Sequence, residues 1–155
     1  MISTRETRRA RDNVAPGATD FSMADHLRLI APALRSTARA ARREVRAAAP
    51  AANERPYQSG PPRSKGAVWK IARYCLGDEE VAGIGMSSTH VLLYFYRGVE
   101  LDEGSGLLEG EGKIMRSIRL RTPAEAARPE VKRMLRKAFR LASKRAPNPR
   151  PRRSH

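Results

Sequence analysis

The side chains with the most chemical potential are concentrated in residues 97–116, a segment that mixes carboxylates, glycines and cations. Its carboxylates are Glu100, Asp102, Glu103, Glu109 and Glu111. Its glycines are Gly98, Gly104, Gly106, Gly110 and Gly112, and Lys113 follows the last of them. Glycine-rich backbone can direct N–H groups at an anion, and carboxylate oxygens are ligands of hard cations. Anion binding, cation binding and internal charge pairing are therefore the chemistries to compare.

The spacing of these residues differs from that of the common loops that bind phosphate or calcium. It matches neither GxGxxG nor the P-loop, because Ile114 stands where the P-loop needs Ser or Thr after its lysine. The carboxylates lack the EF-hand spacing, and neighbouring arginines compete for them. A nucleotide-phosphate loop and a metal site stay as alternatives, and we assign no metal ligands.

Two arginines are expected at the end of the sheet where this segment leaves and returns. Side chains two apart in a strand share a face, so Arg116 lies with Ile118 and Leu120. By the same rule Arg97 lies with Phe95. A partly buried guanidinium requires acceptors or a carboxylate. This requirement favours internal charge pairing.

We therefore interpret the acidic segment mainly as architecture. Its carboxylates are expected to neutralise three neighbouring cations, Arg97, Lys113 and Arg116. Three leucines are expected to hold the loop on the core, namely Leu101, Leu107 and Leu108. The candidate residues for ligand binding or for loop structure are Arg97, Gly98, Asp102, Gly106, Gly110, Gly112, Lys113 and Arg116.

The rest of the chain shows no catalytic signature. His90 begins a strand-like run near Ser87 and Ser88, but no acid at a recognisable position completes a triad. Cys75 closes an apolar run and is expected to be an inert core thiol rather than a nucleophile. As the only cysteine, it permits no intrachain disulfide and no thiolate zinc site.

Two amphipathic helices are predicted to flank this segment. Apolar residues recur every three or four positions over residues 27–48. Because proline interrupts a helix interior, the regular helix is expected to begin at Pro32, with residues 24–31 forming a separate turn or a kinked extension. After Pro129 a second apolar stripe predicts a helix to about Lys144.

Four strand-like runs lie between the helices. They are residues 66–75, 81–87, 90–98 and 113–121. Residues 50–66 are rich in proline and glycine, which indicates a connecting loop with at most a short edge strand around Tyr57. Thr122 and Glu125 have capping-box spacing and predict a short helical turn before the last helix.

These elements predict an α+β fold. We expect a two-layer sandwich in which an antiparallel sheet of about 4–5 strands is covered on one face by the N-terminal and C-terminal helices. Residues 20–145 are expected to form one domain. Residues 1–19 are predicted to be a disordered basic arm, and residues 146–155 a disordered basic, proline-rich tail.

The net charge of +15 suggests contact with polyanions. On the first helix a cationic stripe runs beside the apolar one and contains Arg35, Arg39, Arg42 and Arg46. The last helix has a similar stripe with Lys132, Arg133, Arg136 and Arg140. These stripes are candidates for sequence-independent contact with nucleic acid, or they are solvated faces that keep the protein soluble. No aromatic residue interrupts them, so base stacking lacks a platform there.

Tyrosines are expected on the opposite face of the sheet. Tyr94 and Tyr96 alternate with Phe95, and Tyr74 is placed beside them. The group is either a ligand platform or ordinary cross-strand packing.

Residues 90–125 resemble the characteristic block of the YdhG-like domain family of bacterial proteins. The matching residues are Arg97, Gly98, Leu101, Asp102, Gly106, Leu107, Leu108, Gly110, Gly112, Lys113 and Arg116. With the flanking helices the resemblance extends over about residues 30–145. It implies a frataxin-like α+β sandwich. Because one relative is described as an iron chaperone for iron–sulfur cluster assembly, it also implies iron handling as a family-level role.

Together these observations predict a cytoplasmic, non-enzymatic binding or accessory factor without a cofactor, whose partner is an unidentified protein or small ligand. The alternative is a sequence-independent nucleic-acid binder. A third hypothesis is an enzyme that uses Arg97, Lys113 and Arg116. The longest apolar run, residues 91–96, is far too short to span a bilayer, so no membrane contact is expected.

Overall fold

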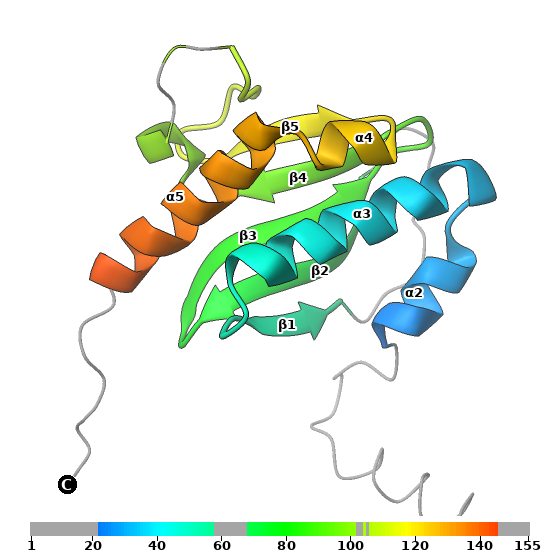
Figure 1. The fold of residues 1–155 in the computed structure, drawn as a ribbon, viewed down its shortest axis with the longest axis horizontal. Helices are drawn as coiled ribbons and strands as arrows, with labels where there is room; N and C mark the ends of the chain where they lie inside the picture. The colour runs from blue at the N-terminus through cyan, green and yellow to red at the C-terminus, as the bar shows by residue number, and fades with distance from the viewer. Residues whose placement is uncertain (1–21, 58–67, 102–103, 105, 146–155) are drawn as a thin grey trace, which may run out of the picture.

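Five antiparallel strands form one open sheet in their sequence order. The structure, a computed structural model, describes residues 22–57, 68–101, 104 and 106–145 (Figure 1). The strands are β1 (Asn53–Pro56), β2 (Trp69–Leu76), β3 (Glu79–Met86), β4 (Val91–Phe95) and β5 (Arg116–Leu120). The helices are α2 (Met23–Leu29), α3 (Pro32–Ala48), α4 (Pro123–Ala126) and α5 (Pro129–Arg145), with a 3-10 helix η1 (Gly98–Leu101). The predicted arm, residues 1–19, and tail, residues 146–155, lie outside the described residues.

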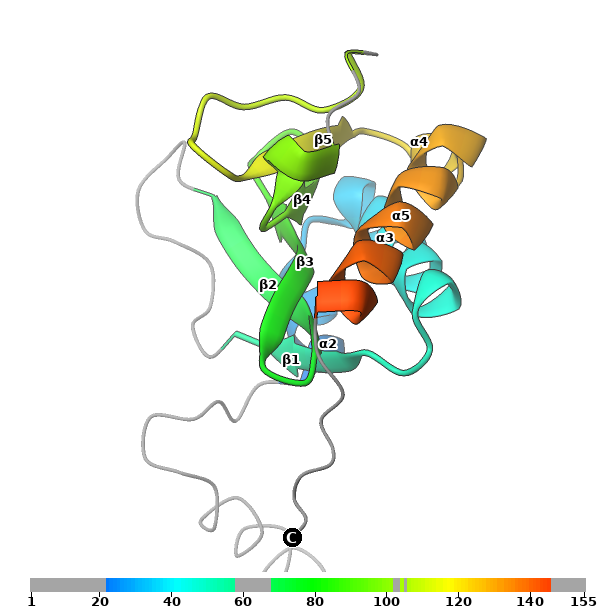
Figure 2. The ribbon, with the colours of Figure 1, turned by 90° about the vertical axis from the view of Figure 1, so that its left-hand side faces the viewer.

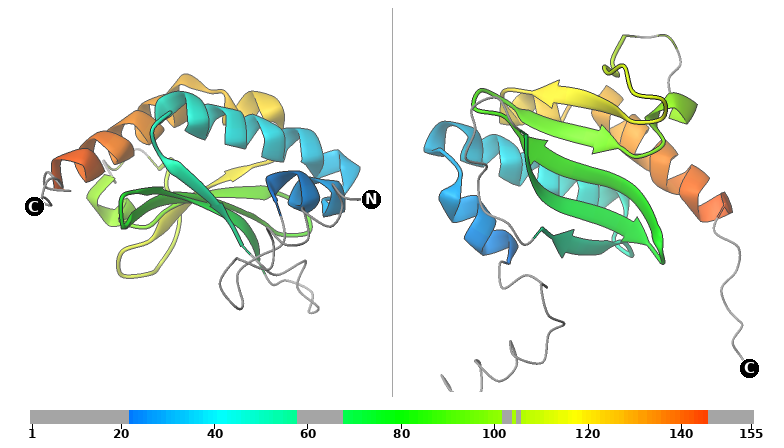
Figure 3. Two further views of the ribbon diagram at one scale, coloured as in Figure 1. Left: turned by 90° about the horizontal axis from the view of Figure 1, so that it is seen from below. Right: turned by 180° about the vertical axis from the view of Figure 1, so that it is seen from behind.

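Helices α3 and α5 cover the same face of the sheet, as Figures 2 and 3 show. Between the layers, Val45 of α3 and Leu135 of α5 are fully buried together with Ile84 and Leu93 of the sheet. The predicted α+β fold with an antiparallel sheet covered on one face is therefore confirmed. Among the described helices, none has the length and apolar composition needed to cross a bilayer.

The first helical region is divided into two helices before Pro32, as the sequence predicts. α3 begins at Pro32, because a proline at the first helical position has no N–H that needs a partner. α2 is a separate helix within the predicted extension. The guanidinium of Arg35 donates to the main-chain carbonyls of Leu27 and Ile30, both at 3.0 Å. This arginine therefore caps the carboxyl end of α2.

The position predicted for Tyr74 is wrong. In the sheet Tyr74 lies opposite Ala82, and Ala82 lies opposite the fully buried Phe95. Since cross-strand partners share a face, Tyr74 points toward the helices, whereas Tyr94 points away from them. Alternation within one strand does not reveal the register between strands, and β2 carries register shifts on both sides of Tyr74.

Glu54 of β1 joins the sheet to α3. Its carboxylate accepts hydrogen bonds from Tyr74 Oη at 2.6 Å and from Arg42 Nε and Nη2, both at 2.8 Å. Arg46 lies 3.5 Å away on the same helix. Burial alone would raise the pKa of Glu54, but the hydrogen bonds from Arg42 and Tyr74 outweigh it and hold the pKa below its usual value.

Replacing Glu54 should therefore cost stability in a pH-dependent way. We expect Glu54→Gln to lower the free energy of unfolding at pH 7 by about 1–3 kcal/mol, because hydrogen bonds to a charged group are lost. The lowered folded-state pKa stabilises the fold above the unfolded pKa of about 4.3, and this stabilisation is lost as the pH falls through the folded value. Urea unfolding from pH 7 to pH 3 should show the difference between wild type and variant shrinking below about pH 4.3.

Glu111→Gln is the matched control, because it removes the same charge from an exposed side chain. It should change the free energy of unfolding by less than about 0.5 kcal/mol at pH 7. A difference between wild type and Glu54→Gln that stays constant across the pH range would contradict the role given to Glu54.

Candidate functional site

The 3-10 helix η1 is held in place by a network of ion pairs. Arg97 Nε donates to Glu100 Oε2 at 2.9 Å, as the sequence predicts for this pair. The other oxygen of Glu100 accepts from Arg145 Nη1 at 3.0 Å, and Arg145 also pairs with Glu79 at the start of β3. The network fastens the beginning of the loop to the end of α5. Arg97 thus has a structural partner.

The partner expected for Arg116 is wrong. Arg116 Nη1 donates to the main-chain carbonyls of Gly112 at 2.6 Å and Met115 at 2.7 Å, and no carboxylate of the described residues accepts a hydrogen bond from it. β5 begins at Arg116, three residues later than predicted, so the chain before it turns back and offers these carbonyls at close range. Ile114 is 59% exposed instead of lying in the strand.

The remaining loop candidates are dispersed. Glu109 pairs with Arg119 at 3.2 Å, and its backbone forms a bridge to Ser117. Lys113 is exposed, and Asp102 lies outside the described residues. Leu101 is buried, and Leu107 and Leu108 pack partly buried against the core, which confirms their predicted contact with it.

Gly98 is required by a close approach between η1 and β5. A Cβ atom at this position would lie 2.4 Å from Arg116 Cβ and 2.6 Å from the Arg116 main-chain nitrogen. Gly110 has a positive φ, whereas a Cβ atom at Gly112 would meet nothing closer than 3.9 Å. Gly98 therefore positions the loop.

The cations predicted on the first helix are largely committed to internal contacts. Arg35 caps α2, and Arg42 and Arg46 pair with Glu54. Arg39 and Arg43 are exposed. Helix α3 therefore presents fewer available cations than its sequence suggests.

Helix α5 keeps most of its cations at the surface. Lys132 pairs with the buried Glu44 of α3 at 2.7 Å and so joins the two helices. Arg133, Arg136 and Arg140 are exposed. In the part of the chain that the structure describes, no carboxylate lies within ion-pair distance of these three arginines.

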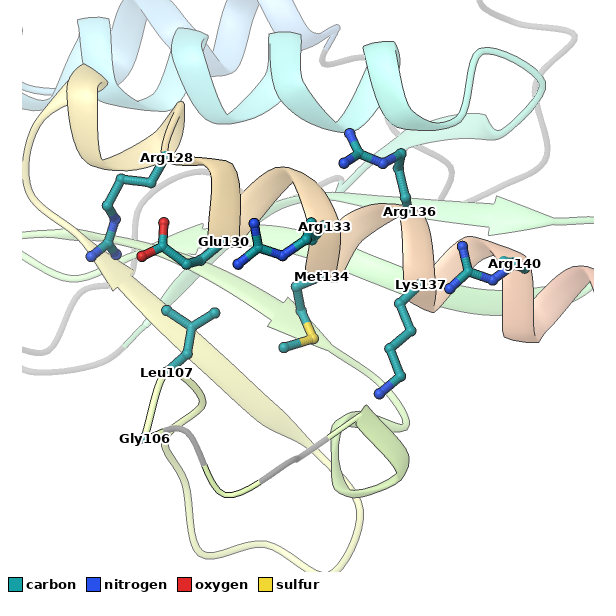
Figure 4. A pocket seen from close by; sticks show the side chains of 9 residues that line it. All are labelled: Gly106, Leu107, Arg128, Glu130, Arg133, Met134, Arg136, Lys137 and Arg140. Carbon is teal, nitrogen blue, oxygen red and sulfur yellow. The ribbon is translucent and has the colours of Figure 1, made fainter.

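These three arginines line a groove of about 640 Å³ between α5 and the loop before β5. In Figure 4 Lys137 points from α5 toward the loop and Leu107 on the loop faces Met134, whereas Arg136 points toward α3. The described lining contains five basic side chains, Arg128, Arg133, Arg136, Lys137 and Arg140, and one carboxylate, Glu130. The described part of the lining therefore carries more basic than acidic side chains and includes the apolar side chains of Leu107 and Met134.

Sequence patterns indicate only part of this groove. They place Gly106 in the loop and Arg133, Arg136 and Arg140 on the last helix, and the structure brings the two groups together. They do not indicate Arg128, which precedes the helix and is outside its periodic stripe. Nothing in the spacing indicates that the loop folds over this particular face of α5.

The described lining of the groove consists of cations, one carboxylate and apolar groups, and it contains no histidine, cysteine, serine or threonine. Elsewhere Cys75 is buried, and burial raises the pKa of its thiol. Among the described residues, no group of three or more His, Cys, Asp or Glu side chains is placed to hold a metal ion.

The tyrosines on the helix-free face pack against the sheet. The rings of Tyr94 and Tyr96 meet edge to face at 5.5 Å, and Tyr96 Oη lies 3.1 Å from Tyr57 Oη. Tyr94 lies directly on Gly83, where a Cβ atom would come within 2.4 Å of the ring. With Tyr94 only 5% exposed, this group offers little open aromatic surface.

Comparison of the chain with protein-family models, with curated proteins and with solved structures finds no match.

The close contact at Gly98 leads to a test of the loop architecture. Gly98→Ala should lower the free energy of unfolding by about 1–3 kcal/mol, because the new methyl group meets the main chain of Arg116 and one segment has to move. Gly112→Ala, in the same loop, should change it by less than about 0.5 kcal/mol. Urea unfolding measures both, and equal effects would contradict the packing of η1 on β5.

Proposed function

We propose that this protein is a non-enzymatic accessory factor that binds nucleic acid through the phosphate backbone without reading sequence. The observation that carries the proposal is the groove of α5, in which Arg133, Arg136 and Arg140 are exposed and have no carboxylate within ion-pair distance among the described residues. Guanidinium groups form bidentate hydrogen bonds with phosphate oxygens, and they stay charged at every physiological pH.

The physical basis is counterion release. Each phosphate neutralised by a Lys or Arg side chain frees condensed cations, so affinity depends on salt and hardly on base identity. The exposed Arg39 and Arg43 of α3 extend the positive surface on the same side of the sheet. The formal net charge of +15 adds long-range attraction.

The family-level role in iron handling is not part of the proposal. Its candidate ligands are carboxylates of the acidic segment, and the described pairs there are already matched by arginine: Glu100 with Arg97 and Arg145, and Glu109 with Arg119. A site at Arg97 and Arg116 is likewise not proposed, because both guanidinium groups have protein acceptors.

The proposal includes membership of the YdhG-like family, a frataxin-like architecture and a cytoplasmic location. Support for the first two comes from the order of elements, with a meander of five strands between the helices, and from Gly98, which matches the family block and has a clear packing role. Support for the third comes from the single, buried Cys75.

Binding should weaken when the exposed arginines of α5 lose their charge. We expect the triple variant Arg133→Gln, Arg136→Gln, Arg140→Gln of the full chain to bind a fluorescent oligonucleotide about 10- to 100-fold more weakly near 0.1 M salt. The slope of log Kobs against log salt concentration should fall in magnitude by about 2 to 3, because three phosphate contacts are lost. Fluorescence anisotropy over a salt series measures both quantities.

A charge-matched control distinguishes binding at this groove from attraction by the net positive charge of the protein. Arg55→Gln, Lys70→Gln and Arg121→Gln together remove three exposed cations that do not line it. This variant should keep most of the affinity. Equal losses in the two variants, or no binding by wild type even at low salt, would contradict the proposed function.

A further inference from the structure

The cations of α5 line a hollow rather than a ridge. One wall consists of side chains of α5, and the other is the loop that carries Gly106 and Leu107 (Figure 4). Its volume of about 640 Å³ lies within the range of roughly 300–1,000 Å³ of sites that enclose small organic molecules. A ligand that lies in the hollow therefore contacts cations along the α5 side.

The shape of this site disfavours duplex nucleic acid. A protein helix reads a duplex by projecting into a major groove about 12 Å wide, and a helix with its side chains is itself about 10–12 Å across. The loop with Gly106 and Leu107 stands beside the cationic face of α5 and hinders it from entering a duplex in this way. A single strand is narrower than a duplex, so it suits a groove with the helix on one side and the loop on the other.

The floor of the hollow is apolar. Met134 is nearly fully buried, and Leu107, which faces it in Figure 4 and is partly buried against the core, provides the open apolar surface. Arginine planes stack on unpaired bases. The surface thus pairs an apolar contact for a base with cations for the phosphates on either side.

The length of the cationic wall fits a short strand segment. Arg133 and Arg140 are seven residues apart on α5, which corresponds to about 10 Å at a rise of about 1.5 Å per residue. One strand carries a phosphate about every 3.4 Å along the axis of a duplex and is more extended when single. The wall therefore spans about two or three phosphates.

From these features we propose that the groove selects single-stranded nucleic acid over duplex by holding one strand between α5 and the loop, with a base against Leu107. This inference rests on the proposed function and names the ligand of the same site. The proposed contacts require a base with adjacent phosphates, and either a strand or a free nucleotide can supply them. The strand is the committed ligand, because several phosphates are needed to engage Arg133 and Arg140 together.

The test compares three ligands with the full-length chain. Fluorescence anisotropy at one fixed salt concentration measures binding of a labelled 15-nucleotide strand and of the same sequence as a duplex. We expect the strand to bind at least about 10-fold more tightly. ATP, added as a competitor, should displace the strand only at concentrations far above those of an unlabelled strand.

Leu107→Glu probes the hollow directly, since it sets a carboxylate opposite the cations. It should weaken strand binding about 10-fold or more and duplex binding less than about 3-fold. Ile114→Glu is the control, because it puts the same charge on an exposed position of the same loop that does not line the groove. It should change strand binding by less than about 3-fold.

Leu107→Lys is the control for loss of folding. Any polar residue at this position disturbs the packing of the loop, but lysine adds a cation to the hollow while glutamate adds an anion. Strand binding by Leu107→Lys should therefore exceed that of Leu107→Glu by more than 10-fold, with both melting temperatures measured alongside.

The outcomes separate the two proposals. Absence of binding to both strand and duplex overturns the proposed function and this inference together. Duplex binding as tight as strand binding, equal effects of Leu107→Glu and Ile114→Glu, or displacement by ATP as effective as by the unlabelled strand overturns the inference alone.

Discussion

A shortage of carboxylates governs this structure. The chain has 31 Lys and Arg residues against 16 Asp and Glu residues, so internal pairing can neutralise only part of the positive charge. Several carboxylates stand where the layers meet. Glu44 joins α3 to α5 through Lys132, and Glu54 joins β1 to α3 through Arg42. Cations paired in this way become part of the architecture, and those left over define the surface.

The leftover cations are not spread evenly. Arg133, Arg136 and Arg140 of α5 line a hollow whose other side is the loop before β5. Glu130 is the one carboxylate in its described lining. Cations at such a partly open surface keep much of their hydration, so holding them there costs little stability. The acidic loop therefore contributes to the proposed site mainly by its fold, since Leu107 provides part of the apolar floor.

Periodicity predicted much of the fold but not its local contacts. The start of α3 at Pro32, the last helix, the single covered face of the sheet and the buried Leu101 all follow from patterns within one element. The errors concern relations between elements. Alternation within one strand puts Tyr74 on the wrong face, because strand register is a property of two strands. The pattern before β5 predicts strand and a carboxylate partner for Arg116, but the chain turns there and offers main-chain carbonyls instead.

The sequence by itself determined which residues form helices and strands, which of their faces are apolar, and that the molecule carries an excess of positive charge. It did so because helix and strand periods are local properties of the chain. Only the tertiary structure decided which arginines remain available. Arg42 and Arg133 occupy equivalent positions in their cationic stripes, yet Arg42 pairs with Glu54 and Arg133 lines the groove. Which of the two happens depends on how segments far apart in the sequence pack together.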